Sequence, residues 1–175
     1  MAWLNKLFGK TATKAADTVG AQTLGSRDPA GTIHVDELAP ELHQRIQALC
    51  AEGDALDDAD RQEDALKRYN EAWKLVPSPK SEWSASTWIL TAIGDVSFRA
   101  GYLTSALEAL EYAMHCPGAL GNPFIHLRLG QVLFERGAED RAADELARAF
   151  MGAGDEIFAS EDSKYRDFLA GRMKP

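Results

Sequence analysis

Cysteine is scarce in this sequence. Cys50 and Cys116 are the only two cysteines among 175 residues, and neither belongs to a CxxC pair or to a Cys/His set with the spacing of a zinc site. A disulfide framework and a structural metal are therefore not expected. The sequence predicts no cofactor and no metal site.

Long apolar runs are also missing. No stretch approaches the ~20 consecutive apolar residues that a transmembrane helix needs. The opening residues, MAWLNKLFGK, are a poor match to a secretory signal because Asn5 and Lys6 interrupt a short apolar segment. The default expectation is a cytoplasmic protein.

Catalytic motifs are absent as well. Gly9–Lys10–Thr11 has the ending of a phosphate-binding loop, but Leu4 stands where that loop needs its first glycine. Neither HExxH nor GxSxG occurs. The sequence therefore predicts a protein that is not an enzyme.

Positive charge is in the minority and unevenly placed. The net charge is −8, and residues 1–27 carry +3, which leaves −11 on residues 28–175. An acidic body argues against nucleic-acid binding, which depends on Lys and Arg neutralising phosphates. It suits a basic protein partner, although many bacterial cytosolic proteins are simply acidic.

What the sequence does contain is an internal repeat. Three times, a glycine is followed by an alanine 12 residues later, by Tyr or Leu 4 residues further on, and by another alanine after 3 more. The three sets are Gly53, Ala65, Tyr69 and Ala72; Gly94, Ala106, Leu110 and Ala113; and Gly130, Ala142, Leu146 and Ala149. Small residues at fixed spacing let paired helices approach closely, so the repeats predict helix pairs.

These positions resemble the tetratricopeptide repeat, a helix–turn–helix unit of 34 residues. Gly101 and Gly137 fall between the paired helices, while the first repeat departs from the pattern with Glu52 at a usually apolar position. The glycines lie 41 and 36 residues apart, so extra residues are expected in loops near 77–87 and 117–123. The resemblance implies an all-α fold: a short right-handed α-solenoid of three such helix pairs plus a C-terminal capping helix.

The predicted organisation has four parts. They are a short amphipathic segment at 1–17, a linker at 18–34, three repeats at 35–159 and a capping helix at 160–175. The first repeat helix is expected to start at Val35, with Pro40 in its first turn. The capping helix is expected to open with the acidic run around Glu161 and to bury Tyr165, Phe168 and Leu169.

The resemblance also implies that the first helix of each pair lines a concave groove. With each repeat glycine set as position 8, the candidate partner-binding residues are Asp54, Asp57, Asp58, Trp88, Thr91, Asp95, Phe98, Phe124, Leu127, Gln131 and Phe134. A groove that is acidic at one end and aromatic at the other suits a basic segment with apolar anchors. Phe98 and Phe134 can equally be core residues, and the aspartates can be an ordinary solvated face.

One subtype of the family is excluded by the same register. Repeats that grip the carboxylate tails of chaperones use Lys, Asn and Arg in the groove. The matching positions here hold Cys50, Asp54, Ala92 and Phe124, and Arg128 alone fits. No such clamp is predicted.

Residues 1–17 raise a separate possibility. Trp3, Leu4, Leu7 and Phe8 fall on one helical stripe, with Lys6, Lys10 and Lys14 nearby. A basic amphipathic helix can lie on an anionic membrane. It can also dock on its own repeat array or on a neighbour, and protein docking is the favoured alternative.

Three functions are compatible with these features. The first is a protein-protein interaction module, an adaptor or chaperone that binds a basic client. The second is an immunity protein that neutralises a secreted toxin, because residues 121–158 are similar to small bacterial tetratricopeptide proteins that lie near secreted-toxin loci. The third is an adaptor held at a membrane by residues 1–17. The sequence leaves the oligomeric state open.

Overall fold

The computed structural model describes residues 38–173, and all regular structure in that range is helical. The expected all-α class is therefore confirmed for this part of the chain. The α-helices are α2 (Pro40–Asp58), α3 (Gln62–Leu75), α4 (Ser84–Arg99), α5 (Leu103–Ala113), α6 (Pro123–Glu135), α7 (Glu139–Ala153) and α8 (Ser163–Arg172). Two short 3-10 helices, η2 (Lys80–Glu82) and η3 (Gly154–Phe158), lie in the connections.

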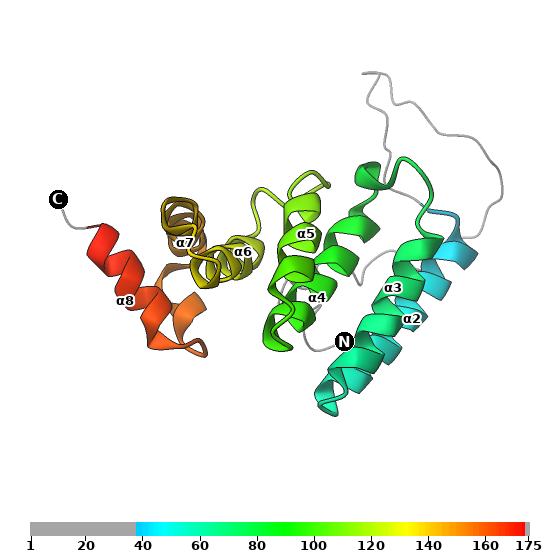
Figure 1. The fold of residues 1–175 in the computed structure, drawn as a ribbon. Helices are drawn as coiled ribbons and strands as arrows, with labels where there is room; N and C mark the ends of the chain where they lie inside the picture. Colours follow the sequence, from blue (N-terminus) through cyan, green and yellow to red (C-terminus); the bar gives the residue numbers. More distant parts are fainter. Residues whose placement is uncertain (1–37, 174–175) are drawn as a thin grey trace, which may run out of the picture.

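Six of the helices form three successive pairs, which are α2–α3, α4–α5 and α6–α7 (Figure 1). The second helix of one pair packs against the first helix of the next, through the α3–α4 and α5–α6 contacts. At the C-terminal end, α8 packs against α7 and η3. The order of packing thus follows the order of the chain.

A glycine lies at the crossing point of each pair. A Cβ atom built on Gly53, Gly94 or Gly130 would come within 2.6 Å of Tyr69, 2.5 Å of Leu110 and 2.8 Å of Leu146, respectively. Each of these partners lies 16 residues after its glycine, and each is at most 1% exposed. Only a residue without a side chain allows this close approach of the two helices.

The turns within the pairs need a left-handed backbone. Gly101 and Gly137 adopt φ values of 81° and 75°, as glycine does without steric cost. The first pair places Asp60 at the equivalent point, with a φ of 57°. A short polar side chain such as Asp tolerates this conformation better than most residues, so the first turn forms without a glycine.

Two helix starts differ from the expectation. Ala39 is extended, with φ −48° and ψ 135°, and α2 begins at Pro40 instead of near Val35. The ring of a proline disfavours helical geometry in the residue before it. At the other end, the Asp162 carboxylate accepts a hydrogen bond from the Lys164 amide at 3.0 Å, so α8 begins at Ser163, three residues later than expected.

A buried histidine joins the two helices of the third pair to the loop before them. His126 is 4% exposed. Its Nδ1 atom lies 2.5 Å from Oε2 of Glu145 in α7, and its Nε2 atom lies 2.9 Å from the Leu120 carbonyl oxygen. Because an ionised Glu145 and the Leu120 carbonyl are both acceptors, the site favours an imidazole that is protonated and donates from both ring nitrogens. The hydrogen bond with Glu145 raises the pKa of His126, against the opposing effect of burial and of nearby Arg148.

This histidine makes stability depend on pH. Because its pKa is raised in the folded state, its contribution is complete below the ordinary value near 6.5 and is lost as pH rises through the folded-state pKa. We expect the free energy of unfolding of the wild type, relative to His126→Gln, to fall between pH 6 and pH 9. Urea denaturation of both proteins across that range measures the difference. A difference that stays constant or grows with pH would contradict a protonated His126.

Candidate functional site

Arg128 of α6 lies at the centre of a charged network. Its Nη2 atom is 2.7 Å from Oδ1 of Asp95 in α4, and its Nη1 atom is 3.1 Å from Oε2 of Glu161, which precedes α8. Gln131 accepts a hydrogen bond from Nη1 at 2.7 Å and donates one to Glu161 at 2.8 Å. The Arg128 side chain is only 6% exposed. The network therefore joins α4, α6 and the C-terminal segment inside the protein.

Two aromatic rings flank the same guanidinium. The Arg128 Cζ atom lies 4.9 Å from the ring centroid of Phe98 and 5.3 Å from that of Phe124. A guanidinium at such distances interacts favourably with the electron-rich face of the ring. Phe98 also lies 6.5 Å from Tyr165 of α8, ring centroid to ring centroid. These rings help to shield the network from water.

The network continues to the first pair through Arg99. This side chain is 3.2 Å from Asp95 on its own helix and also pairs with Asp57 of α2. Asp57, Asp95 and Glu161 thus face two guanidiniums, which leaves one net negative charge. Two of the aspartates predicted to attract a basic partner already bind arginines of the same chain.

Asp54 is buried between the two helices of the first pair. It is 5% exposed and accepts a hydrogen bond from the Tyr69 hydroxyl at 2.8 Å. Burial, together with the Asp54 charge, raises the pKa of Tyr69, so the phenol stays protonated and keeps donating. Burial likewise raises the pKa of the neighbouring Cys50 thiol to about 12, which leaves this cysteine a poor nucleophile.

Three more of the predicted groove residues are buried. Thr91, Leu127 and Gln131 are at most 1% exposed. The Thr91 hydroxyl donates to the Thr87 carbonyl at 2.6 Å, and Leu127 packs in a cluster with Phe158 and Tyr165. These side chains therefore lie beneath the surface, where a partner does not contact them.

Helix α8 covers the aromatic end of the predicted groove. Phe134 lies 5.5 Å from Tyr165 and 4.9 Å from Phe168, ring centroid to ring centroid. The Tyr165 hydroxyl donates to Glu135 at 2.7 Å, and Lys164 pairs with the same carboxylate at 2.7 Å. Of the two alternatives open for Phe98 and Phe134, packing inside the protein fits their surroundings.

A smaller set of predicted residues remains accessible. Asp58 is exposed, whereas Trp88, Phe124, Asp57 and Asp95 are partly exposed. Trp88 contacts His43 edge to face, at 6.3 Å between ring centroids. These five residues come from the first helices of the three pairs, and we call them the first-helix face. The predicted Trp3, Leu4, Leu7 and Phe8 lie outside the described residues.

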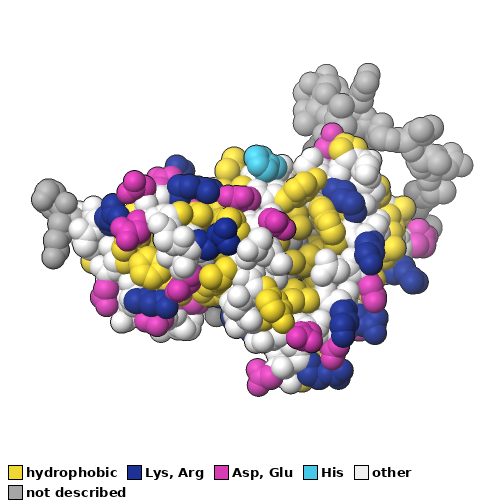
Figure 2. All heavy atoms as spheres, in the orientation of Figure 1, with side chains coloured by type: hydrophobic (Ala, Val, Ile, Leu, Met, Phe, Trp, Pro, Cys, Tyr) yellow, Lys and Arg dark blue, Asp and Glu magenta, His cyan; other side chains and the backbone are white. Residues whose placement is uncertain are grey.

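Sequence reasoning missed two features. From the sequence, Glu161 was interpreted only as an acid at a helix start. In the structure it pairs with Arg128, and Arg128 is the one groove residue that fits the carboxylate-clamp pattern. The second is a hollow of about 430 Å³ between α3 and α5, above α4. It is lined by Leu66, Asn70, Trp73, Leu90, Ile93, Ser97, Tyr102, Ser105, Glu108, Ala109 and Tyr112. Figure 2 shows hydrophobic side chains gathered over these helices.

Comparison with known proteins does not assign this chain to a family. No protein-family model matches the sequence, and no curated protein matches it significantly. Within residues 38–173, no group of three or more His, Cys, Asp or Glu side chains is arranged to hold a metal ion. None of the helices in the same range has both the length and the apolar character needed to cross a bilayer. The charge pattern, the aromatic side chains and the hollow are thus the features on which a function can be proposed.

Proposed function

We propose that this chain is a non-catalytic, cytoplasmic protein-binding module of the tetratricopeptide type. In this proposal residues 35–159 form three repeats of a right-handed α-solenoid, and residues 160–175 cap it. The support comes from equivalent packing in the three pairs, where a glycine meets Tyr69, Leu110 or Leu146 at the crossing point. Helix pairs that contact mainly their neighbours in sequence are typical of repeat proteins.

The partner is a basic protein that binds the first-helix face. The observations that carry this proposal are that Asp58 is exposed, that Trp88 and Phe124 are partly exposed, and that the first helices α2 and α4 are joined by the Asp57–Arg99–Asp95 ion pairs. A tryptophan at a protein surface is a frequent hot spot of binding energy. Carboxylates beside it steer and orient a positively charged segment.

Paired variants test the proposal. Affinity capture from the native organism is carried out with the wild type, with Trp88→Ala and with Asp58→Asn. We expect Trp88→Ala to weaken partner binding at least tenfold, as loss of a hot spot worth about 2 kcal/mol would. Asp58→Asn should lower the salt dependence of binding with a smaller loss of affinity.

Two exposed positions away from this face serve as controls. Met151 is 75% exposed and Asp144 is exposed on α7, so Met151→Ala and Asp144→Asn remove an aliphatic side chain and a charge without touching the first-helix face. They should bind as the wild type does. If the partner is retained by Trp88→Ala and Asp58→Asn as strongly as by the controls, the first-helix face is not the binding site.

The two alternative functions differ from this one in mechanism. An immunity protein would bind a basic toxin and block its active site, so a toxin gene beside this one and rescue of toxin-expressing cells would favour that role. A membrane-associated adaptor would depend on residues 1–17. Equal binding of the wild type and a Trp3→Asp/Leu7→Asp variant to anionic liposomes would exclude it.

A further inference from the structure

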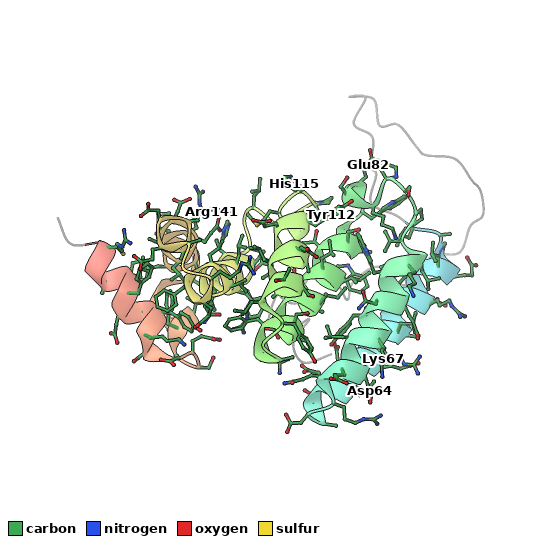
Figure 3. All side chains as sticks on the ribbon, in the orientation of Figure 1. Asp64, Lys67, Glu82, Tyr112, His115 and Arg141 are labelled. Atoms are coloured by element: carbon green, nitrogen blue, oxygen red, sulfur yellow. The ribbon has the colours of Figure 1, made fainter. Side chains whose placement is uncertain are left out.

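The hollow between α3 and α5 is an apolar surface with aromatic walls. Leu90 and Ile93 of α4 form its floor and are 5% and 8% exposed. Trp73 of α3 and Tyr112 of α5 meet at one side of the hollow. Their rings are in edge-to-face contact, with the ring centroids 5.6 Å apart. Figure 3 labels Tyr112 on α5, where it is 41% exposed. Tyrosine and tryptophan around an apolar floor are typical of protein-binding sites.

Carboxylates lie at the rim of the hollow away from Trp73, whereas the Lys80 Nζ atom lies 4.5 Å from the centroid of the Trp73 ring. Glu108, which lines the hollow, is exposed. At the far end the Tyr102 hydroxyl donates to Glu63 of α3 at 3.0 Å, which places a second carboxylate beside the opening. Asn70, Ser97 and Ser105 are the uncharged polar residues of the lining. The hollow therefore fits an occupant with apolar anchors whose basic residues lie toward Glu63 and Glu108.

This surface is separate from the first-helix face. Residues of a helix are spaced about 100° apart around its axis. On α4, positions 90, 93 and 97 of the hollow then fall on the opposite side from positions 88 and 95 of the first-helix face. A ligand in the hollow leaves the first-helix face open, so the two sites can be tested independently.

The chain itself contains a segment of the required chemistry. Trp3, Leu4, Leu7 and Phe8 recur at the spacing with which a helix presents anchors to a groove. Lys6, Lys10 and Lys14 accompany them, in the part of the sequence that carries +3 against −11 elsewhere. Opposite charges of this size favour association between the segment and the acidic body.

The segment is also within reach. Residues 18–37 separate it from Leu38, and twenty residues span at most about 70 Å. The helices that wall the hollow, with 14 and 11 residues, are about 21 Å and 17 Å long at 1.5 Å per residue. A tether of this kind raises the local concentration of the segment to about the millimolar range, so docking with a dissociation constant below that concentration becomes the populated state.

We propose that residues 1–17 dock in the hollow between α3 and α5 of the same chain. Trp3, Leu4, Leu7 and Phe8 supply the apolar contacts, and the lysines face Glu108 and Glu63. Docking covers Trp73 and Tyr112, which would otherwise present an aromatic patch to other proteins. It makes the N-terminal segment an internal ligand of the repeat body.

Disulfide trapping in the full chain tests this proposal. Phe8→Cys is combined with Ser105→Cys, which lines the hollow, and in a control with Asp58→Cys on the first-helix face. Native Cys50 and Cys116 are buried, and burial raises the pKa of their thiols to about 12 and about 11, so they exchange slowly. We expect the Ser105→Cys pair to form an intramolecular disulfide at least tenfold faster than the control pair. Adding Leu4→Asp/Leu7→Asp should reduce its rate to that of the control.

Three results would overturn the proposal. Equal rates for the two pairs would mean that the segment has no preference for the hollow. A faster reaction with Asp58→Cys would place the segment on the first-helix face. Disulfide-linked dimers in place of a cross-linked monomer would assign the hollow to the segment of a second copy. None of these results bears on whether a partner binds at Trp88, so the function proposed above is tested separately.

Discussion

Replacing Arg128 by methionine should lower the free energy of unfolding by about 3–5 kcal/mol. Methionine retains much of the apolar stem of the arginine, but it removes the guanidinium that lies beside Phe98 and Phe124 and compensates two carboxylates. The side chains of Asp95 and Glu161 are 20% and 16% exposed, so their charges would be left largely desolvated, Asp95 with Arg99 and Glu161 with the Gln131 amide as its remaining partner. Denaturant unfolding monitored by circular dichroism measures the loss.

Two further variants test whether the loss of stability comes from the buried carboxylates that Arg128 compensates. Arg148→Met removes an arginine that is 52% exposed and pairs with Asp144 one turn away, and an exposed pair of this kind contributes about 0.2–1 kcal/mol. Adding Asp95→Asn and Glu161→Gln to Arg128→Met removes the stranded charges and should restore a large part of the lost stability. If Arg128→Met is no more destabilising than Arg148→Met, the network does not hold the C-terminal segment in place.

Gly130→Val is the second substitution with a large expected effect, a loss of about 3 kcal/mol. A Cβ at this position would lie 2.8 Å from Cγ of Leu146 and 3.0 Å from its backbone nitrogen. Because one of these contacts is backbone, a change of rotamer at Leu146 cannot relieve both. The helices α6 and α7 must then move apart, which exposes a side chain that is now fully buried. Thermal and denaturant unfolding both report the change.

Gly171 offers a matched control on α8. A Cβ added there meets no atom within 4 Å, and valine has a slightly better helix propensity than glycine. Gly171→Val should therefore alter stability by less than about 0.5 kcal/mol. A Gly130→Val protein as stable as Gly171→Val would show that the α6–α7 crossing is looser than its geometry indicates.

Much of the fold could be predicted because its determinants are local. A glycine and the residue 16 positions later meet across one helix pair, so the spacing in sequence already contains the contact. Gly101 and Gly137 could be placed in turns for the same reason, since a left-handed backbone favours glycine. Asp60 was missed because an aspartate in a turn resembles any other polar loop residue until its φ value is seen.

Less of the candidate site could be predicted. Arg128 and Glu161 are separated by 33 residues, and nothing in their sequence neighbourhoods distinguishes this pair from exposed ion pairs such as Arg148–Asp144. Counting positions on a helix placed Thr91 and Gln131 on the first-helix side, but it could not show that neighbouring segments bury them. The path of the C-terminal segment decides which aromatics are covered, and that path depends on packing across the whole chain.

The hollow could not be predicted because it is a space between pairs. It depends on how far α5 lies from α3, and this distance is set by the packing of both helices on α4. The sequence signal nearest to it was the loop near 77–87, where extra residues were expected between the first two helix pairs. A longer loop does not say which side chains will line a space between the helices.

The central claim is that a protein partner binds the first-helix face, and oxidative footprinting of the captured complex tests it most directly. The method compares the oxidation of Trp88 and Phe124 with that of Trp73 and Tyr112, with and without partner. We predict strong protection of Trp88 and Phe124 and unchanged oxidation of Trp73 and Tyr112. Protection confined to Trp73 and Tyr112, or to none of the four residues, would contradict the claim.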